Sequence, residues 1–147
     1  MDKVKSMLCK AKKKDSSEWV EGYYVCINNT YHSIYTGYGE VDCGGYYPDF
    51  HEINPKTICK CTGLPAYWDD LENELHECDV WEHDLLEVEY KGEQVVAEVK
   101  FEGGMFILAS VEFEDSYIPL FDVTQIEDEY WIDAKVIGNI FDNSNLL

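Results

Sequence analysis

The chain contains no arginine, and its eleven basic residues are all lysines, set against 30 acidic residues. Arginine is the side chain that most often holds phosphate and carboxylate groups through two parallel hydrogen bonds. Affinity for DNA or RNA depends largely on basic side chains that neutralise phosphates. Since the net charge is −19, we expect no direct binding of nucleic acid.

Long apolar runs are also missing. No stretch of 18 consecutive apolar residues occurs, so no transmembrane helix and no membrane partner are predicted. The N-terminal lysines are not followed by the apolar segment of a secretory signal. We therefore expect a cytoplasmic protein whose six cysteines are reduced thiols.

What the chain does contain is apolar side chains and unevenly placed charge. Hydrophobic residues make up 46% and aromatic residues 14% of the sequence, enough for a packed core. The length suits one domain or two small subdomains. Six of the eleven lysines lie in residues 1–14, beside a single acid, which leaves 29 acids and five lysines for the rest of the chain.

Residue patterns predict a mainly β fold, in the β-rich α+β class. Aromatic and branched residues at 19–27 and 31–35 flank the turn signal Asn28-Asn29, which indicates a hairpin. Apolar residues alternate with polar ones at 86–90 and 95–101, and glycine-containing turns separate these runs from each other and from 105–111. Together with a closing strand at 136–141, this pattern predicts a small C-terminal SH3-like antiparallel barrel.

One short helix is also predicted. Leu71, Leu75 and Cys78 follow one another at helical spacing, and Asp69 or Asp70 could cap the first turn. We expect an amphipathic helix over 70–78 with an acidic outer face. The predicted organisation is then as follows: a basic N-terminal segment at 1–17, an N-terminal β subdomain at 18–66, an acidic helical connector at 67–84, and a C-terminal small β-barrel subdomain at 85–147.

Four segments carry a family resemblance: EWVEGYYV at 18–25, INPKTI with TGL at 53–64, WEHDL at 81–85, and VIGNIFDN at 136–143. They are similar to YopX-type proteins of phages and prophages. The resemblance implies a phage or prophage origin, a mostly β fold in two parts, and self-association into a homo-oligomer. It carries over no catalytic residue. His83 stands where the family usually has a glycine. The span between Leu64 and Asp84 is longer than the usual connection, so the acidic stretch within it is largely specific to this chain.

The connector opens an acidic run. Between Asp69 and Glu89 there are ten carboxylates and no lysine. Carboxylates two residues apart on a strand are separated by about 6.6–6.8 Å, and those at i and i+4 on a helix by about 6 Å, so such arrays can occupy a channel built for nucleic acid. The predicted partner-binding residues are these acids and two flanking tryptophans: Asp69, Asp70, Glu72, Glu74, Glu77, Asp79, Glu82, Asp84, Glu87, Glu89, Trp68 and Trp81.

The favoured hypothesis is a non-catalytic inhibitor of a basic host protein that handles nucleic acid, such as a CRISPR effector, a restriction enzyme or a repair factor. Two alternatives stay open. The acidic face could be merely solvated on a structural or regulatory phage protein. The chain could also be an oligomer that binds a small ligand, such as a nucleotide signal, in the Gly/Tyr-rich region 35–47.

Metal and catalytic patterns are weak. Cys59, Cys61, His76, Cys78 and His83 match no common zinc spacing, and residues 69–74 lack the glycine and the spacing of a calcium loop. The pair Cys78 and His76 has no third residue in the sequence to orient it, and no nucleotide-binding or serine-nucleophile motif occurs. We therefore predict no metal, no cofactor and no enzymatic activity.

Overall fold

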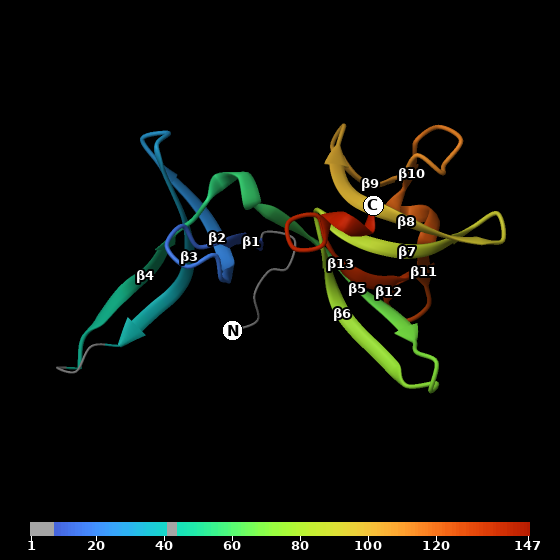
Figure 1. Ribbon diagram of the computed structural model, residues 1–147. Coiled ribbons are helices and arrows are strands. Elements are labelled where there is room, and N and C mark those ends of the chain that lie inside the picture. The colour runs from blue at the N-terminus through green and yellow to red at the C-terminus, as the bar shows by residue number, and fades with distance from the viewer. Residues whose placement is uncertain (1–7, 41–43) are drawn as a thin grey trace. The chain divides into compact units, whose positions relative to one another are not determined.

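The computed structural model describes residues 8–40 and 44–147, and the chain divides into two compact units, Met1–Cys61 and Thr62–Leu147 (Figure 1). Strands dominate both units, which confirms the mainly β class. The helices of the described part are short 3-10 turns of three or four residues. None of them has the length and apolar character needed to cross a membrane.

The first unit is an antiparallel sheet. Its strands, in the order in which they pair, are the start of β5 (Cys59–Asp69), β1 (Cys9–Lys12), β2 (Trp19–Ile27), β3 (Tyr31–Glu40) and β4 (Tyr46–Glu52), and the 3-10 turn η2 (Pro55–Thr57) precedes β5. The predicted hairpin is confirmed: Ile27 pairs with Tyr31, and Asn28 and Asn29 have φ of 54° and 58°. Two successive left-handed residues make the turn whose twist matches that of the strands.

A small cluster of apolar side chains forms the core of this unit. Ala11, Ile34 and Ile53 are buried together, with Val20 and Ile58 packed against them. The predicted basic N-terminal segment is partly described, since its residues 9–12 form β1 between β2 and β5, whereas residues 1–7 lie outside the described residues.

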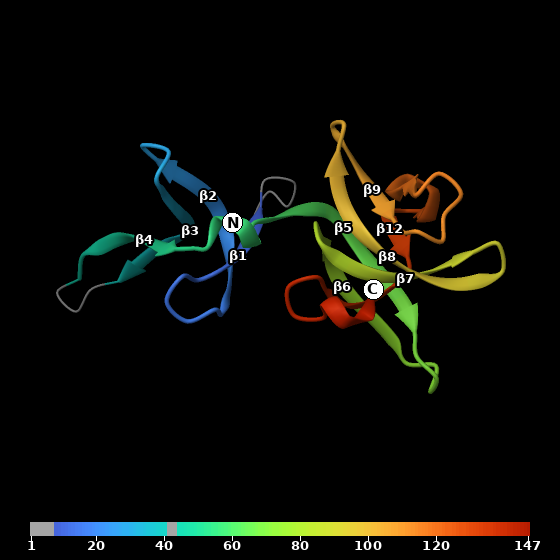
Figure 2. The same ribbon diagram turned by 45° about the horizontal axis from the view of Figure 1, so that its top comes forward.

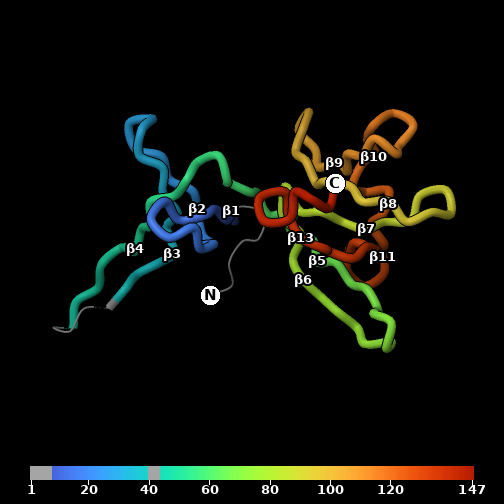
Figure 3. Tube along the Cα trace, viewed as in Figure 1, coloured from blue at the N-terminus to red at the C-terminus, as the bar shows by residue number. Residues whose placement is uncertain are grey.

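The second unit contains the remaining strands. They are the rest of β5, then β6 (Leu75–Trp81), β7 (Asp84–Tyr90), β8 (Glu93–Glu102), β9 (Met105–Ala109), β10 (Tyr117–Pro119), β11 (Thr124–Ile126), β12 (Tyr130–Asp133) and β13 (Lys135–Asn139), with 3-10 turns η3 (Leu120–Val123) and η4 (Ser144–Leu146). Strands β10, β9, β8, β7 and β13 pair in that order to form a five-stranded sheet. Figure 3 shows β7, β8 and β9 running back and forth beside one another.

The alternation predicted for this sheet is confirmed. Leu86, Val88 and Val99 are buried on one face, whereas Glu87 and Glu89 lie on the other. A fully buried aliphatic side chain contributes about 1.5–3 kcal/mol relative to an exposed one. The inner face of the sheet is thus the main source of stability in this unit.

The predicted SH3-like barrel is wrong, because this sheet is open, with β10 and β13 at its edges. Strand β12 pairs in parallel with β5, where Ile132 faces Ala66, instead of closing the five-stranded sheet. The alternation of apolar and polar residues identifies a strand but not the strand with which it pairs, because any other strand with an apolar face could pair with it.

The predicted acidic helix is also wrong. Residues 70–74 form the turn of a hairpin between β5 and β6, whose two strands lie side by side in Figure 2. Leu71 and Leu75 are exposed, so their helical spacing reflects no buried stripe. The hairpin is favoured because Trp68 on β5 stacks on His76 of β6, with ring centroids 5.5 Å apart. A stack across two strands stabilises the sheet more than the isolated helical alternative, which is too short to persist alone.

Candidate functional site: an acidic ridge

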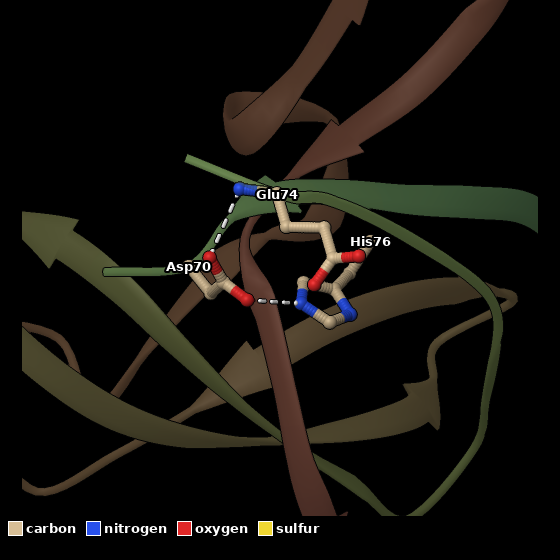
Figure 4. Close-up of side chains that lie close together, drawn as sticks. All are labelled: Asp70, Glu74 and His76. Atoms are coloured by element: carbon tan, nitrogen blue, oxygen red, sulfur yellow. Dashed lines mark hydrogen bonds and ion pairs between the residues drawn. The ribbon is translucent and has the colours of Figure 1, made fainter. Parts of the chain in front are cut away.

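The side chain of Asp70 organises the turn between β5 and β6. One carboxylate oxygen accepts hydrogen bonds from the backbone N–H groups of Glu72 at 2.8 Å and Glu74 at 2.9 Å. The other lies 2.8 Å from Nε2 of His76 (Figure 4). The hydrogen bond from His76, followed by those from the two backbone groups, lowers the pKa of Asp70. The charged carboxylate is therefore the form that holds the turn.

The same residues form the one group with metal-ligand proximity in the described part of the chain. Ligand atoms of Asp70, Glu74 and His76 all lie within 4.8 Å of one another. However, both oxygens of Asp70 already accept hydrogen bonds from the protein, so the turn is stabilised without an ion. The weak zinc set of the sequence is not gathered in the described residues, and Cys59 is buried with its thiol donating to the carbonyl of Thr57.

We expect the Asp70→Ala variant to loosen residues 71–74 while the strands stay paired, because two backbone donors lose their acceptor. The folded-state pKa of Asp70 lies below its ordinary value of 3.8, so the turn of the native protein is fully ordered above that value. Its order is lost as the pH falls through the lowered pKa. Backbone 15N relaxation and the ring-current shifts of His76 report both effects. The Asp69→Ala variant is the control, and equal mobility in the two variants would contradict this role.

Tyr67 joins this hairpin to a second acidic turn. Its hydroxyl lies 2.8 Å from a carboxylate oxygen of Glu129, in the turn between β11 and β12, and 3.2 Å from one of Glu77 on β6. The hydrogen bond to Glu129, together with burial and the two negative charges, raises the pKa of Tyr67 to about 12. The phenol therefore stays protonated and donates to these carboxylates.

Tyr67 thus connects acids of the β5–β6 hairpin with acids of the turn between β11 and β12, and we call these acids together the acidic ridge. Asp70 extends it on the other face of the hairpin, because it bonds His76, which stacks on Trp68, the strand neighbour of Tyr67. The members of the ridge are Asp69, Asp70, Glu72, Glu74, Glu77, Glu127, Asp128 and Glu129. No lysine occurs at 67–90 or at 101–134, so neither segment brings a positive charge to the ridge.

Beside Tyr67 the ridge contains a small notch. Tyr67, Trp131 and residues 127–129 line a hollow of about 300 Å³, and the two rings meet edge to face with centroids 5.7 Å apart. The sequence analysis missed this part of the site. The run Glu-Asp-Glu at 127–129 beside Trp131 was the available signal, but nothing in the sequence placed it near residue 67.

The structure divides the predicted partner-binding residues. Asp69, Glu72, Glu74 and Glu77 are exposed on the ridge, joined by the half-buried Asp70. Trp68 is half-buried under His76, and Asp79 and Glu82 are half-buried on β6 and the turn after it. The half-buried Glu87 and the exposed Glu89 belong to the outer face of the five-stranded sheet instead.

Two of the predicted partner-binding residues, Trp81 and Asp84, lie inside the protein. Trp81 is 5% exposed and Asp84 is 4% exposed, and the carboxylate of Asp84 accepts a hydrogen bond of 2.9 Å from the backbone N–H of Trp81. A buried carboxylate that bonds the backbone across a turn cannot meet a partner. The prediction that these two residues bind a partner is therefore wrong, because the β6–β7 turn needs them in its interior.

Comparison with known proteins identifies the family. A family model described as YopX protein matches residues 10–147, nearly the whole chain. The chain belongs to the YopX family. The resemblance of the four sequence segments is thereby confirmed, and YopX membership indicates a phage-type protein. Neither the curated proteins nor the solved structures contain a match.

The YopX-like segment at 136–143 builds a turn after β13. The side chain of Asn139 accepts from the backbone N–H groups of Phe141 and Asp142, and that of Asn143 accepts from the N–H of Asn139. Gly138 has φ of 154°, and a Cβ there would collide with the side chain of Asn143. These residues of the segment therefore have a structural role.

His83 replaces the glycine that the resemblance leads one to expect, and its φ is 72°. A side chain is disfavoured in this left-handed region. His83 compensates through contacts, since its Nδ1 lies 2.9 Å from a carboxylate oxygen of Glu98 and its ring meets Phe141 edge to face. The hydrogen bond to Glu98, with the nearby Glu82, raises the pKa of His83 against the opposing effect of burial.

Proposed function

We propose that this YopX-family chain is a non-catalytic phage or prophage protein that inhibits a basic host protein. The target handles nucleic acid, as a CRISPR effector, restriction enzyme or repair factor does. The acidic ridge occupies the target's nucleic-acid site. The observation that carries the proposal is the joining of two acidic turns, at 69–77 and 127–129, through the hydroxyl of Tyr67.

The charge of the ridge supports competition with nucleic acid. Duplex DNA presents one negative charge per about 1.7 Å of its axis, and its binding proteins present matching lysine and arginine side chains. The ridge offers eight carboxylates on the β5–β6 hairpin and the β11–β12 turn, within segments that contain no lysine. Such crowding of like charge opposes folding, which favours a role for it in binding.

The notch adds a place for a single basic side chain of the target. Its walls are the rings of Tyr67 and Trp131, and the three acids at 127–129 surround it. Lysine and arginine are attracted to aromatic faces and to carboxylates. A basic side chain of the target inserted into the notch would fix the position of the target on the acidic ridge.

A ridge variant tests the proposal directly. It carries five glutamate-to-glutamine changes at Glu72, Glu74, Glu77, Glu127 and Glu129. The tagged wild-type chain captures basic proteins from host lysate at low salt, and a captured target is then purified and titrated with labelled DNA. We expect the wild-type chain to displace the DNA, and the variant to be roughly 10- to 100-fold weaker, since each exposed charge contributes about 0.2–1 kcal/mol. Binding should also weaken steeply as salt is added.

The matched control has the same net charge. It replaces five exposed acids outside the ridge, Asp15, Glu18, Glu21, Asp115 and Asp122, with their amides, so both variants change the charge from −19 to −14. The proposal requires the control to inhibit as the wild-type chain does. Equal losses in both variants, or full inhibition by the ridge variant, would overturn it.

A further inference from the structure

The outer face of the five-stranded sheet contains a hollow. It measures about 830 Å³ and is bounded by β8, β9, the loop that leads to Tyr117, and Leu146 and Leu147. Binding sites for small molecules and peptides commonly fall between about 300 and 1,000 Å³. None of its lining residues belongs to the acidic ridge.

The pairing of β8 with β9 shows that the residues at the floor of this hollow share one face of the sheet. Glu98 lies opposite Ala109, and Lys100 lies opposite Ile107, and residues directly opposite each other in an antiparallel pair share a face. The neighbouring strand extends that face, because Glu87 of β7 lies opposite Val96. The odd residues of β8, such as Val95 and Val99, are buried on the opposite face in the core.

Apolar side chains make much of the hollow. Ile107 is buried at its floor, whereas Val111 is 94% exposed and Tyr117 and Leu147 are also exposed at its rim. An exposed valine and leucine beside a concave apolar floor are typical of a surface that binds another molecule. The strand gives this surface length, because positions 94–102 of β8 span about 26 Å at roughly 3.3 Å per residue.

The charge of the hollow is strongly negative. Its lining includes four carboxylates and one lysine: Glu93, Glu98, Glu102, Glu112 and Lys100. Glu98 is hydrogen-bonded with His83, and the other three glutamates are exposed. A ligand of this face must therefore supply positive charge as well as apolar side chains.

We propose that this hollow is a groove for a short segment of a partner protein in which basic and apolar side chains alternate. The apolar side chains of the segment pack on Val96, Ile107 and Ala109, and its lysines or arginines meet Glu102 and Glu112. The segment lies in extended conformation with its apolar side chains against the sheet, and the basic side chains between them, which point the other way, reach the exposed Glu102 and Glu112 through their long flexible stems. This site is independent of the acidic ridge and does not rest on the function proposed for it.

Peptide binding to the full chain tests the groove. The probe is the blocked peptide leucine-lysine-valine-lysine-leucine, compared with versions that carry glutamine or glutamate at the two lysine positions. Backbone NMR shifts of the full chain should move at β8, β9 and 110–117 on addition of the lysine peptide. We expect the glutamine peptide to bind roughly tenfold more weakly, and the glutamate peptide to cause no shift.

Charge-reversal variants locate the site. The double variant Glu102→Lys and Glu112→Lys should weaken binding of the lysine peptide by roughly tenfold. Its matched control reverses Glu21 and Asp122, which lie outside the groove. A second variant, Val111→Asp, should weaken all peptides that carry leucine and valine, and its spectrum shows directly whether the sheet remains folded.

Three outcomes would overturn the proposal. In the first, the control weakens binding as much as the groove variant, which would mean that only the net charge attracts the peptide. In the second, the largest shifts fall on 69–77 and 127–129, which would assign the peptide to the ridge. Groove shifts that appear on concentrating the protein alone would identify a second copy of the chain as the occupant.

Discussion

The Gly22→Val variant is expected to lose about 3 kcal/mol of folding stability in the first unit, because no room exists for a side chain at this position. Gly22 is buried in β2 and pairs with Cys9 of β1. A Cβ built on it would collide with the backbone oxygen of Tyr35 and would lie 2.8 Å from Cγ2 of Ile34. The first collision involves backbone, so β2 and β3 must separate before the side chain fits.

Hydrogen exchange measures this effect strand by strand. Amides of β2 and β3 should exchange much faster in the Gly22→Val variant than in the wild-type chain. The control is Glu21→Val, the exposed neighbour on the same strand, which is expected to change stability by no more than about 0.5 kcal/mol. Unchanged protection of β2 and β3 in the Gly22→Val variant would refute this account of the sheet.

The Asp84→Ala variant is expected to lose about 2–4 kcal/mol, because a buried backbone donor would be left without its charged acceptor. Asp84 is 4% exposed, and its carboxylate accepts from the N–H of Trp81. The Asp84→Asn variant keeps an oxygen at this place and should lose less. Urea unfolding monitored by far-UV circular dichroism gives the three free energies of unfolding.

The control for Asp84 is Glu89→Ala on the same strand, β7. Glu89 is exposed, so its removal should change the free energy of unfolding by no more than about 0.5 kcal/mol. The prediction fails if Asp84→Ala unfolds at the same urea concentration as Glu89→Ala. A large loss of unfolding free energy for Asp84→Ala but not for Glu89→Ala would show that Asp84 has a structural role, whereas exposed acids between Asp69 and Glu89 are available to a partner.

Local pattern predicted much of the fold. The alternation at 86–90 and 95–101 correctly assigned the inward and outward residues of β7 and β8. The Asn28-Asn29 turn correctly placed the hairpin of β2 and β3. Both features depend on neighbours in the sequence, since the short loop at 28–30 fixes the register of the strands on either side of it.

The acidic run shows where local pattern fails. Leu71, Leu75 and Cys78 have helical spacing, but that spacing carries no stabilisation unless the leucines are buried, and both are exposed. The stack of Trp68 on His76 and the bonds of Asp70 across the turn favour a hairpin instead. Burial likewise separated Asp84 from Asp69, although the two carboxylates are chemically alike in the sequence.

By itself the sequence determined that this YopX-family protein is mainly β, strongly acidic and without arginine, because composition and alternation are properties of the chain. Only the tertiary structure decided which acids share a surface. The parallel pairing of β5 with β12 brings Glu129 to Tyr67, across 62 residues of sequence. Such contacts depend on which strands pair, and that choice is made by the packing of the whole unit rather than by either segment alone.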